Sequence, residues 1–257
     1  METTYYYFLA SLLPQLEMGH PPALHYSDLL PLLRENLTER DFSLVEVMRR
    51  LTDLDNIRAL WLERGVDPRG NFTGVELEEA LNDGEGLPDY VYTFMRQYDK
   101  LVERLRRYSK LYVAYFREEG EEACGFLARY LRFEREWRLV FVGFRAKKAG
   151  RDLAVELQDE DPYDPLVAQL MAQKDGKVFD PPYGYELLRP LFEEHMDAPL
   201  LLHKALCEYR FGYIEKMKER ELFSVDVVLG YFAQLSLVER WIELDSDEGK
   251  QVVNRIV

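Results

Sequence analysis

The fold of this chain is constrained most by two long segments that one glycine separates. In each segment an apolar residue recurs at alternating steps of three and four. The first stripe precedes Gly120 and consists of Val91, Phe94, Tyr98, Leu101, Leu105, Tyr108, Tyr112 and Tyr115. The second follows that glycine and consists of Phe126, Tyr130, Phe133, Trp137, Val140 and Phe144. Because this spacing keeps one helix face apolar, each segment needs a facing partner. We predict a long antiparallel hairpin that turns at Gly120, with arms of roughly 40 Å.

Helix signals also dominate the rest of the chain. Thr73 and Glu76 have the spacing of a capping box and predict a short helix that ends near Gly84. Further helices are expected at residues 27–37, 38–50, 53–65, 165–171, 185–195, 198–220 and 225–243, with a last piece from 247 to the end. Only residues 5–9 and 177–179 look strand-like. The prediction is an all-α protein, a funnel-like multi-helix bundle of helical hairpins with the long hairpin at its centre.

Breaks between these helices suggest three parts within one compact domain. We expect an N-terminal helical unit at 1–87, the long hairpin at 88–158 and a C-terminal helical unit at 159–257. The breaks lie at residues 84–88 and at the acidic, proline-containing stretch 159–165. With 257 residues, of which 47% are hydrophobic, the chain is large enough to bury a full core.

Charge and cysteine content narrow the class of protein. The net charge of −14 argues against a general nucleic-acid binder, because phosphate contacts need a positive surface. Cys124 and Cys207 both fall in helix-like segments, which favours buried, reduced thiols over a disulfide. Glu2 stands where a secretory signal has basic residues, and Pro14 ends the first apolar run. We therefore expect a cytoplasmic protein without a membrane-inserted segment.

Catalytic and metal-binding patterns are nearly absent from the sequence. It has no GxxxxGK[ST], GxGxxG, GxSxG or HExxH motif. Glu17, His20 and His25 share one loop, where exposed histidines are favoured over a metal site. The acidic cluster Glu118, Glu119, Glu121 and Glu122 flanks Gly120 and is interpreted as a solvated turn. We predict no catalytic residue, no cofactor and no metal, and hence a protein that is not an enzyme.

Positive charge is concentrated in one part of the second arm. Between residues 129 and 151 the net charge is +6, which leaves −20 for the remainder of the chain. Its last stretch carries Arg145, Lys147, Lys148 and Arg151, the residues that we predict as a protein-interaction patch. Two interpretations stay open: the run binds an acidic surface, on a partner or on an internal helix, or it is simply solvated.

Several short strings resemble a known family. They are YYYFLASLLP at 5–14, LPDY at 87–90, FEREWR at 133–138, RAKK at 145–148 and VERW at 238–241. They resemble an uncharacterised bacterial family encoded among the genes of V/A-type ATPases. The middle of the chain also looks like the C subunit of archaeal-type ATPases (called d in eukaryotes), an all-helical, funnel-like protein that couples the central stalk to the membrane ring. That protein is longer, so the resemblance implies that one helical unit is trimmed.

The resemblance implies a non-catalytic subunit or assembly factor of a V/A-type ATPase. Its partners would be subunits of the central stalk and the membrane ring, and it would be peripheral to the inner membrane on the cytoplasmic side. Phe133, Trp137 and Trp241 are expected to be structural, with Phe133 and Trp137 holding the two arms in register. Two alternatives remain: a general helical adaptor, or a carboxylate/His metal-dependent enzyme built on Glu17, His20 and His25.

Overall fold

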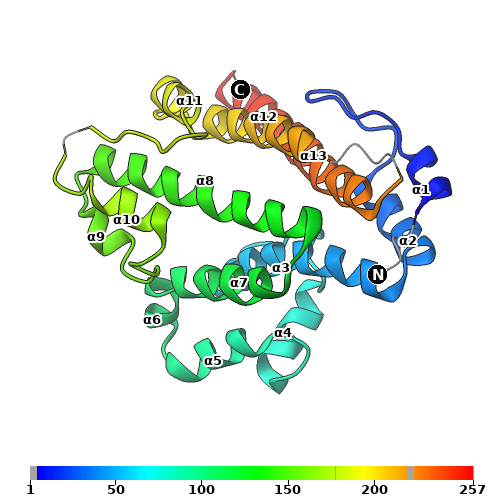
Figure 1. Cartoon of the computed structure of the whole chain (residues 1–257), viewed down its shortest axis with the longest axis horizontal. Helices are drawn as coiled ribbons and strands as arrows, with labels where there is room; N and C mark the ends of the chain where they lie inside the picture. Colours follow the sequence, from blue (N-terminus) through cyan, green and yellow to red (C-terminus); the bar gives the residue numbers. More distant parts are fainter. Residues whose placement is uncertain (1–4, 177, 219–222, 257) are drawn as a thin grey trace. The chain divides into compact units, whose positions relative to one another are not determined.

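The structure, a computed structural model, describes residues 5–176, 178–218 and 223–256, with side chains described up to residue 246. Within these ranges the chain forms thirteen α-helices and no strand (Figure 1). The predicted all-α class is therefore confirmed. The chain divides into two compact units: unit 1 comprises residues 1–42 and 125–257, and unit 2 comprises residues 43–124. The expected division at residues 87 and 158 stays a prediction, since these units have other bounds.

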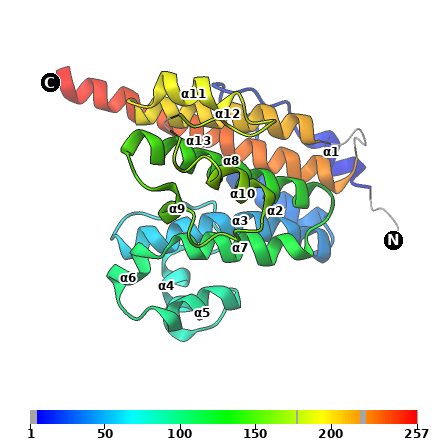
Figure 2. The same cartoon turned by 60° about the vertical axis from the view of Figure 1, so that its left-hand side comes forward.

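Unit 1 is built around the long helix α8. Its helices are α1 (Tyr7–Leu12), α2 (Tyr26–Asn36), the start of α3 (Glu39–Trp61), α8 (Gly125–Ala149), α9 (Leu153–Glu156), α10 (Pro165–Met171), α11 (Leu188–His195), α12 (Pro199–Met217) and α13 (Val225–Ile256). The helices α12 and α13 lie side by side in both cartoon views (Figure 1, Figure 2). The helix α12 also packs against α8 and α11, and α8 packs in addition against α9, α10 and α13.

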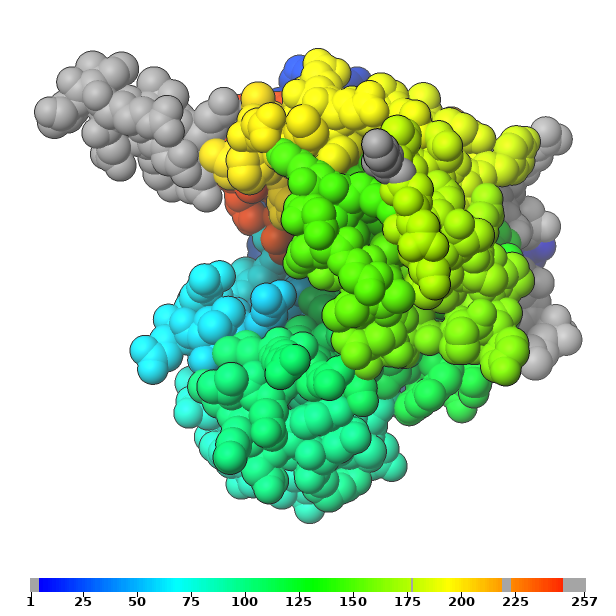
Figure 3. Space-filling view, turned by 90° about the vertical axis from the view of Figure 1, so that its left-hand side faces the viewer, coloured from blue at the N-terminus to red at the C-terminus, as the bar shows by residue number. Residues whose placement is uncertain are grey.

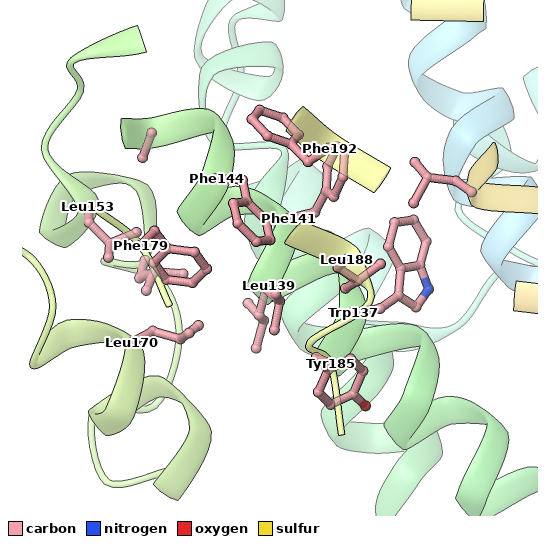
Figure 4. Close-up of a cluster of buried hydrophobic side chains, with 14 of the residues drawn as sticks. Trp137, Leu139, Phe141, Phe144, Leu153, Leu170, Phe179, Tyr185, Leu188 and Phe192 are labelled. Carbon is pink, nitrogen blue, oxygen red and sulfur yellow. The ribbon is translucent and has the colours of Figure 1, made fainter. Parts of the chain in front are cut away.

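The hydrophobic core of unit 1 gathers on the second half of α8. The ring of Phe144 lies 4.9 Å from that of Phe179 and 5.2 Å from that of Phe192. Figure 4 shows these rings beside Phe141, with Leu153 and Leu170 completing the cluster. Gly143 allows this arrangement, because a Cβ atom at residue 143 would overlap the buried ring of Phe179. A glycine inside a helix is thus explained by close ring packing.

Unit 2 contains the rest of α3 and four shorter helices. These are α4 (Gly74–Asp83), α5 (Asp89–Gln97), α6 (Leu101–Arg106) and α7 (Ser109–Glu122). The predicted capping box is confirmed: the hydroxyl of Thr73 accepts from the backbone N–H of Glu76, and the Glu76 carboxylate accepts from the N–H of Thr73. The helix ends at Gly84, whose φ of 77° is the left-handed conformation that glycine adopts readily.

The continuous first arm of the predicted hairpin is not observed. Residues 89–122 form three helices, and Gly120 lies inside α7 rather than at a turn. The break between α7 and α8 is instead at Ala123–Cys124, next to Gly125 with φ of 58°. Two hydroxyl groups of this arm bind α3: Tyr108 donates to the carbonyl of Leu54 and Tyr112 to the carboxylate of Asp55. At the first break the guanidinium of Arg104 donates to the carbonyl of Tyr98 at 2.6 Å.

Other expected boundaries were also wrong. The helices expected at 38–50 and 53–65 are one helix, α3, because Asp53 is not a cap but a buried residue that binds the following loop. Residues 7–9, expected to be strand, belong to α1. Of the second strand-like stretch, residue 177 lies outside the described residues. The helix expected at 165–171 has those bounds in the structure.

Candidate functional site

The FEREWR segment of α8 carries a buried ion cluster and contacts to several elements of unit 1. Glu134 is fully buried, and its carboxylate accepts from the guanidinium of Arg210 on α12 at 2.8 and 2.9 Å. It also pairs with Arg138 one turn away and accepts from the indole N–H of Trp137 at 3.2 Å. Both arginines lie over the Trp137 ring, at 4.7 Å for Arg138 and 5.3 Å for Arg210. One buried carboxylate therefore gathers two cations and an indole.

This arrangement fixes the charge state of Glu134. Burial alone raises the pKa of this carboxyl, but the charges of Arg210 and Arg138 and their hydrogen bonds outweigh burial and hold the pKa below its usual range. The carboxylate likewise raises the pKa of Arg210 against the opposing effect of burial. A carboxylate with a depressed pKa and saturated oxygens is a poor proton donor or acceptor near neutral pH. The geometry around Glu134 is therefore that of a structural ion cluster.

The neighbouring charged residues of the segment connect α8 to other elements of unit 1. Arg135 donates to Glu160 at 2.7 Å and to Asp164, the N-cap of α10, at 2.9 Å. Glu136 accepts from the hydroxyl of Tyr185, just before α11, at 2.6 Å. Consecutive side chains thus bind different segments.

The aromatic residues of the segment pack on α12. Phe133 stacks on Tyr213 with ring centroids 3.9 Å apart and an angle of 8° between the rings. Trp137 meets Arg210 of the same helix. We expected Phe133 and Trp137 to hold two arms in register, but the described contacts are with α12, 70 to 80 residues later in the chain.

The VERW segment on α13 also packs on α12. The indole N–H of Trp241 donates to Glu208 at 2.9 Å, and the ammonium of Lys204 lies 4.2 Å from the ring centre. Glu239 accepts from the first N–H of α2, at Tyr26, at 2.9 Å. The carboxylate therefore caps a helix that has no side-chain cap of its own. The structural role expected for Trp241 stays a prediction.

Three of the four residues predicted as an interaction patch have partners inside unit 1. Lys147 donates to the carbonyl of Lys174 at 2.5 Å, Lys148 pairs with Asp197 at 2.6 Å, and Arg151 pairs with Glu156 at 3.2 Å. Lys148 also donates to the carbonyl of Met196, at the C-terminal end of α11, where a cation is favourable. Arg145 is exposed, and its guanidinium lies 4.8 Å from the Phe141 ring of the same helix.

Unit 2 contains a second charged contact that the sequence did not indicate. Arg50 on α3 binds both carboxylate oxygens of Glu119 on α7, at 2.6 and 2.7 Å. The side chain of Glu119 is only 11% exposed, so this member of the acidic cluster is not the solvated turn residue that we expected. The preceding residue, Glu118, pairs instead with Arg117 at 3.1 Å and is 43% exposed.

A buried carboxylate also organises the loop after α3. Asp53 accepts from the backbone and side chain of Asn71, at 2.6 and 2.7 Å, and Asn56 pairs with the backbone of Asp67. Burial raises the pKa of Asp53, and the hydrogen bonds from Asn71 oppose this shift. Gly70 is required beside them, because a Cβ atom there would overlap Asp53. The cluster consists of loop-fixing hydrogen bonds.

The remaining candidates form no assembled centre. Glu17 and His20 lie 3.7 Å apart with exposed side chains, and His25 turns to Glu239 at 3.2 Å. Among the described residues, no three His, Cys, Asp or Glu side chains are arranged to hold a metal ion. Both cysteines are free; Cys207 is buried as expected, whereas Cys124 is exposed and lies between two helices. No helix in the described ranges is both long and apolar enough to cross a membrane.

These features define a class: an all-helical protein in which the fully buried Glu134 joins two helices and the buried Asp53 fixes a loop. Residues 3–257 match the family described as "Protein of unknown function (DUF2764)", and the chain belongs to that family. It is similar to proteins of Chlamydia muridarum (28% identical over 255 residues, 97% of this chain and 96% of the other) and Chlamydia pneumoniae (28% over 259, 98% and 97%). A protein of Chlamydia trachomatis is 26% identical over 254 residues, 96% of each chain. No solved structure matches.

Proposed function

We propose that this protein is a non-catalytic part or assembly factor of a V/A-type ATPase, similar to the C subunit of the archaeal-type enzymes, that couples the central stalk to the membrane ring. It acts by docking its helices on partner subunits and breaks no covalent bond. The proposal starts from the resemblance of the strings FEREWR, RAKK and VERW to a bacterial family encoded among V/A-type ATPase genes, and of the middle of the chain to the C subunit. Its location is then peripheral to the inner membrane on the cytoplasmic side.

One observation carries the non-catalytic part of the proposal: both carboxylate oxygens of Glu134 already accept hydrogen bonds from neighbouring side chains. In an acid–base site a buried carboxylate is poised near the operating pH and is left free to meet a substrate. Glu134 instead has two arginines and an indole on its oxygens and a depressed pKa. This is the pattern of a group that specifies helix packing, which is what a docking protein requires.

A second feature supports docking at the end of α8. Lys147, Lys148 and Arg151 contact the segments after α10 and α11 and the helix α9, which holds the end of α8 in place. Arg145 stands exposed one turn before Lys148. We propose Arg145 as the residue of the predicted patch that meets an acidic partner surface, with the other three holding its surroundings.

Co-purification from the native host tests the proposal. A tagged chain is recovered under mild, low-salt conditions, and the stalk and membrane-ring subunits are quantified by mass spectrometry. We expect these subunits to be enriched with the wild-type chain and reduced with Arg145→Glu. The control is Arg132→Glu, which reverses another exposed arginine of the same helix. Recovery free of every ATPase subunit would refute the proposal, and equal recovery with both variants would refute the role of Arg145.

The alternative of a general helical adaptor is favoured by one observation. The short helix α1 exposes Tyr7 (58%), Phe8 (65%) and its last residue, Leu12 (46%). Large apolar side chains on one exposed helix are typical of protein-binding segments. If the tagged chain enriches other proteins and no ATPase subunit, the adaptor role replaces the ATPase role.

A further inference from the structure

The short helix α1 turns most of its large side chains toward solvent. Its inward side is held by Tyr6, whose hydroxyl donates to the Asp41 carboxylate and whose backbone N–H donates to the carbonyl of Phe223. Leu9 completes the inward side and is buried. Figure 1 shows α1 beside the start of α13, at one end of unit 1. The large side chains that remain outside, which we call the α1 patch, are Tyr5, Tyr7, Phe8 and Leu12.

The aromatic rings of the α1 patch form a connected row. The ring of Tyr7 lies 5.8 Å from that of Tyr5 and 4.7 Å from that of Phe223, just before α13. Phe8 extends the row with a side chain that is 65% exposed. Rings that already contact one another lose little conformational entropy when a partner covers them. The patch is therefore prepared for binding.

The α1 patch lies in the longest stretch of the sequence that carries no charge. No Asp, Glu, Lys or Arg occurs between Glu2 and Glu17, although the whole chain has a net charge of −14. The elements beside α1 expose charges of both signs: Asp28, Arg34 and Glu35 on α2, and Glu39 and Arg40 on α3. Two copies of this acidic chain therefore meet little like-charge repulsion where their α1 patches face each other.

The size of the patch fits a pair of identical molecules. At roughly 200 Å² for a large side chain, the exposed fractions of its four residues amount to about 400 Å² of mostly apolar area. A specific interface buries about 800 Å² on each side, and somewhat more than half of this area is apolar. The patch thus supplies most of the apolar share of such an interface. An uncharged row of rings is also complementary to itself, as a two-fold contact requires.

We propose that the α1 patch binds the α1 patch of a second copy of this chain. The pair is two-fold symmetric, and Tyr7 and Phe8 of each copy cover those of the other. An anionic membrane fits less well, because it repels a strongly acidic protein. The proposal concerns the free chain and does not require an ATPase partner. In the adaptor alternative a different protein would cover the same residues, and the free chain would stay monomeric.

Sedimentation velocity of the full chain over a range of micromolar concentrations tests this inference. We expect a reversible shift from monomer toward dimer as the concentration rises. Sodium chloride should strengthen the pair, because salt screens the repulsion between two acidic molecules beyond a distance of about 8 Å at physiological ionic strength. An interface made of ion pairs would respond in the opposite way. A chain that is monomeric at every concentration, or a dimer that salt weakens, would overturn the proposal.

Matched variants locate the contact. Phe8→Glu should raise the dissociation constant of the pair about tenfold or more, since two carboxylates then meet in one two-fold contact. Tyr183→Glu, which changes a 96% exposed aromatic residue, should leave the dissociation constant unchanged. Tyr183 belongs to the loop between α10 and α11, on the face of unit 1 that Figure 3 shows in yellow-green. Circular dichroism checks that both variants fold, as expected for exposed residues.

A mixing experiment tests whether the patch meets itself. Phe8→Lys alone should be mainly monomeric, and an equal mixture with Phe8→Glu should restore dimers, because opposite charges then face each other. Failure of the mixture to restore dimers, or equal effects of Phe8→Glu and Tyr183→Glu, would overturn the proposal. The experiment contains no ATPase subunit, so its failure leaves the co-purification result unaffected and the two proposals fail separately.

Discussion

The guanidinium of Arg210 on α12 lies 2.8 Å from the fully buried carboxylate of Glu134 on α8. The two residues are 76 positions apart in the chain. With Arg138 and Trp137 they form the polar centre of unit 1. A buried carboxylate that loses its charge leaves buried guanidinium groups without compensation, which is strongly destabilising. This contact therefore determines how α8 and α12 pack.

Glu134→Gln should lower the free energy of unfolding by about 3–5 kcal/mol at pH 7. The amide keeps the shape of the side chain but removes the negative charge between Arg138 and Arg210. Urea denaturation followed by circular dichroism measures the change. Glu193→Gln, at an exposed position of α11, should change it by less than about 0.5 kcal/mol. Equal effects of the two variants would contradict the structural role of Glu134.

The same variant should change how stability depends on pH. The pKa of Glu134 is lower in the folded protein than its ordinary value of 4.5. The carboxylate therefore makes its full contribution to the free energy of unfolding above pH 4.5. The contribution is lost as the pH falls through the lowered pKa of the folded state. Wild-type stability should therefore decline more than that of Glu134→Gln below pH 4.5. Parallel declines would show that Glu134 has no depressed pKa.

Gly143→Ala should destabilise the protein by about 1–2 kcal/mol, although alanine is the better helix former by about 1 kcal/mol. The new methyl group overlaps the buried ring of Phe179, which the core holds in place. Gly212→Ala on α12, with nothing within 4 Å of the new methyl group, should stabilise by about 0.5–1 kcal/mol. Thermal or urea unfolding checks both; stabilisation by both substitutions would contradict the packing of Phe179.

Arg135→Met should increase hydrogen exchange in residues 157–171 without comparable change in α12. Arg135 holds Glu160 and the N-cap Asp164, so its loss frees the segment that leads into α10. Arg132→Met, at an exposed position three residues earlier, is the control and should leave exchange unchanged. If both variants exchange alike, the contacts of Arg135 do not hold this segment.

Tyr185→Phe should cost about 1 kcal/mol, because the hydroxyl donates to Glu136 at 2.6 Å from a buried ring. Tyr183→Phe, two residues earlier with a side chain 96% exposed, should be neutral. The difference between the two unfolding free energies isolates the Tyr185 hydrogen bond. An equal value for both variants would exclude it.

Local signals were sufficient for part of the fold. The Thr73–Glu76 capping box and the helix at 165–171 depend on neighbouring residues, and both were predicted correctly. The heptad pattern continues through Tyr98 and Arg107, so it did not predict the breaks there. Nor did it indicate that Tyr108 and Tyr112 bind α3 through their hydroxyl groups. Local periodicity cannot report such contacts.

The polar centre illustrates the same limit for the candidate site. Glu134 and Arg138 have i,i+4 spacing, which by itself indicates an ion pair on a helix surface. The second cation, Arg210, comes from another helix, so the burial of Glu134 has no local sequence signal. The basic run after it was recognisable, whereas its contacts with Lys174, Asp197 and Glu156 depend on how the later helices fold back.

A double-mutant cycle between Glu134 and Arg210 tests most directly whether this carboxylate holds helices together. Unfolding free energies are measured for the wild type, Glu134→Gln, Arg210→Met and the double variant at neutral pH. We predict a coupling energy of about 2 kcal/mol or more, since the second substitution removes a charge that the first has already left unpaired. A coupling energy below about 0.5 kcal/mol would contradict the account.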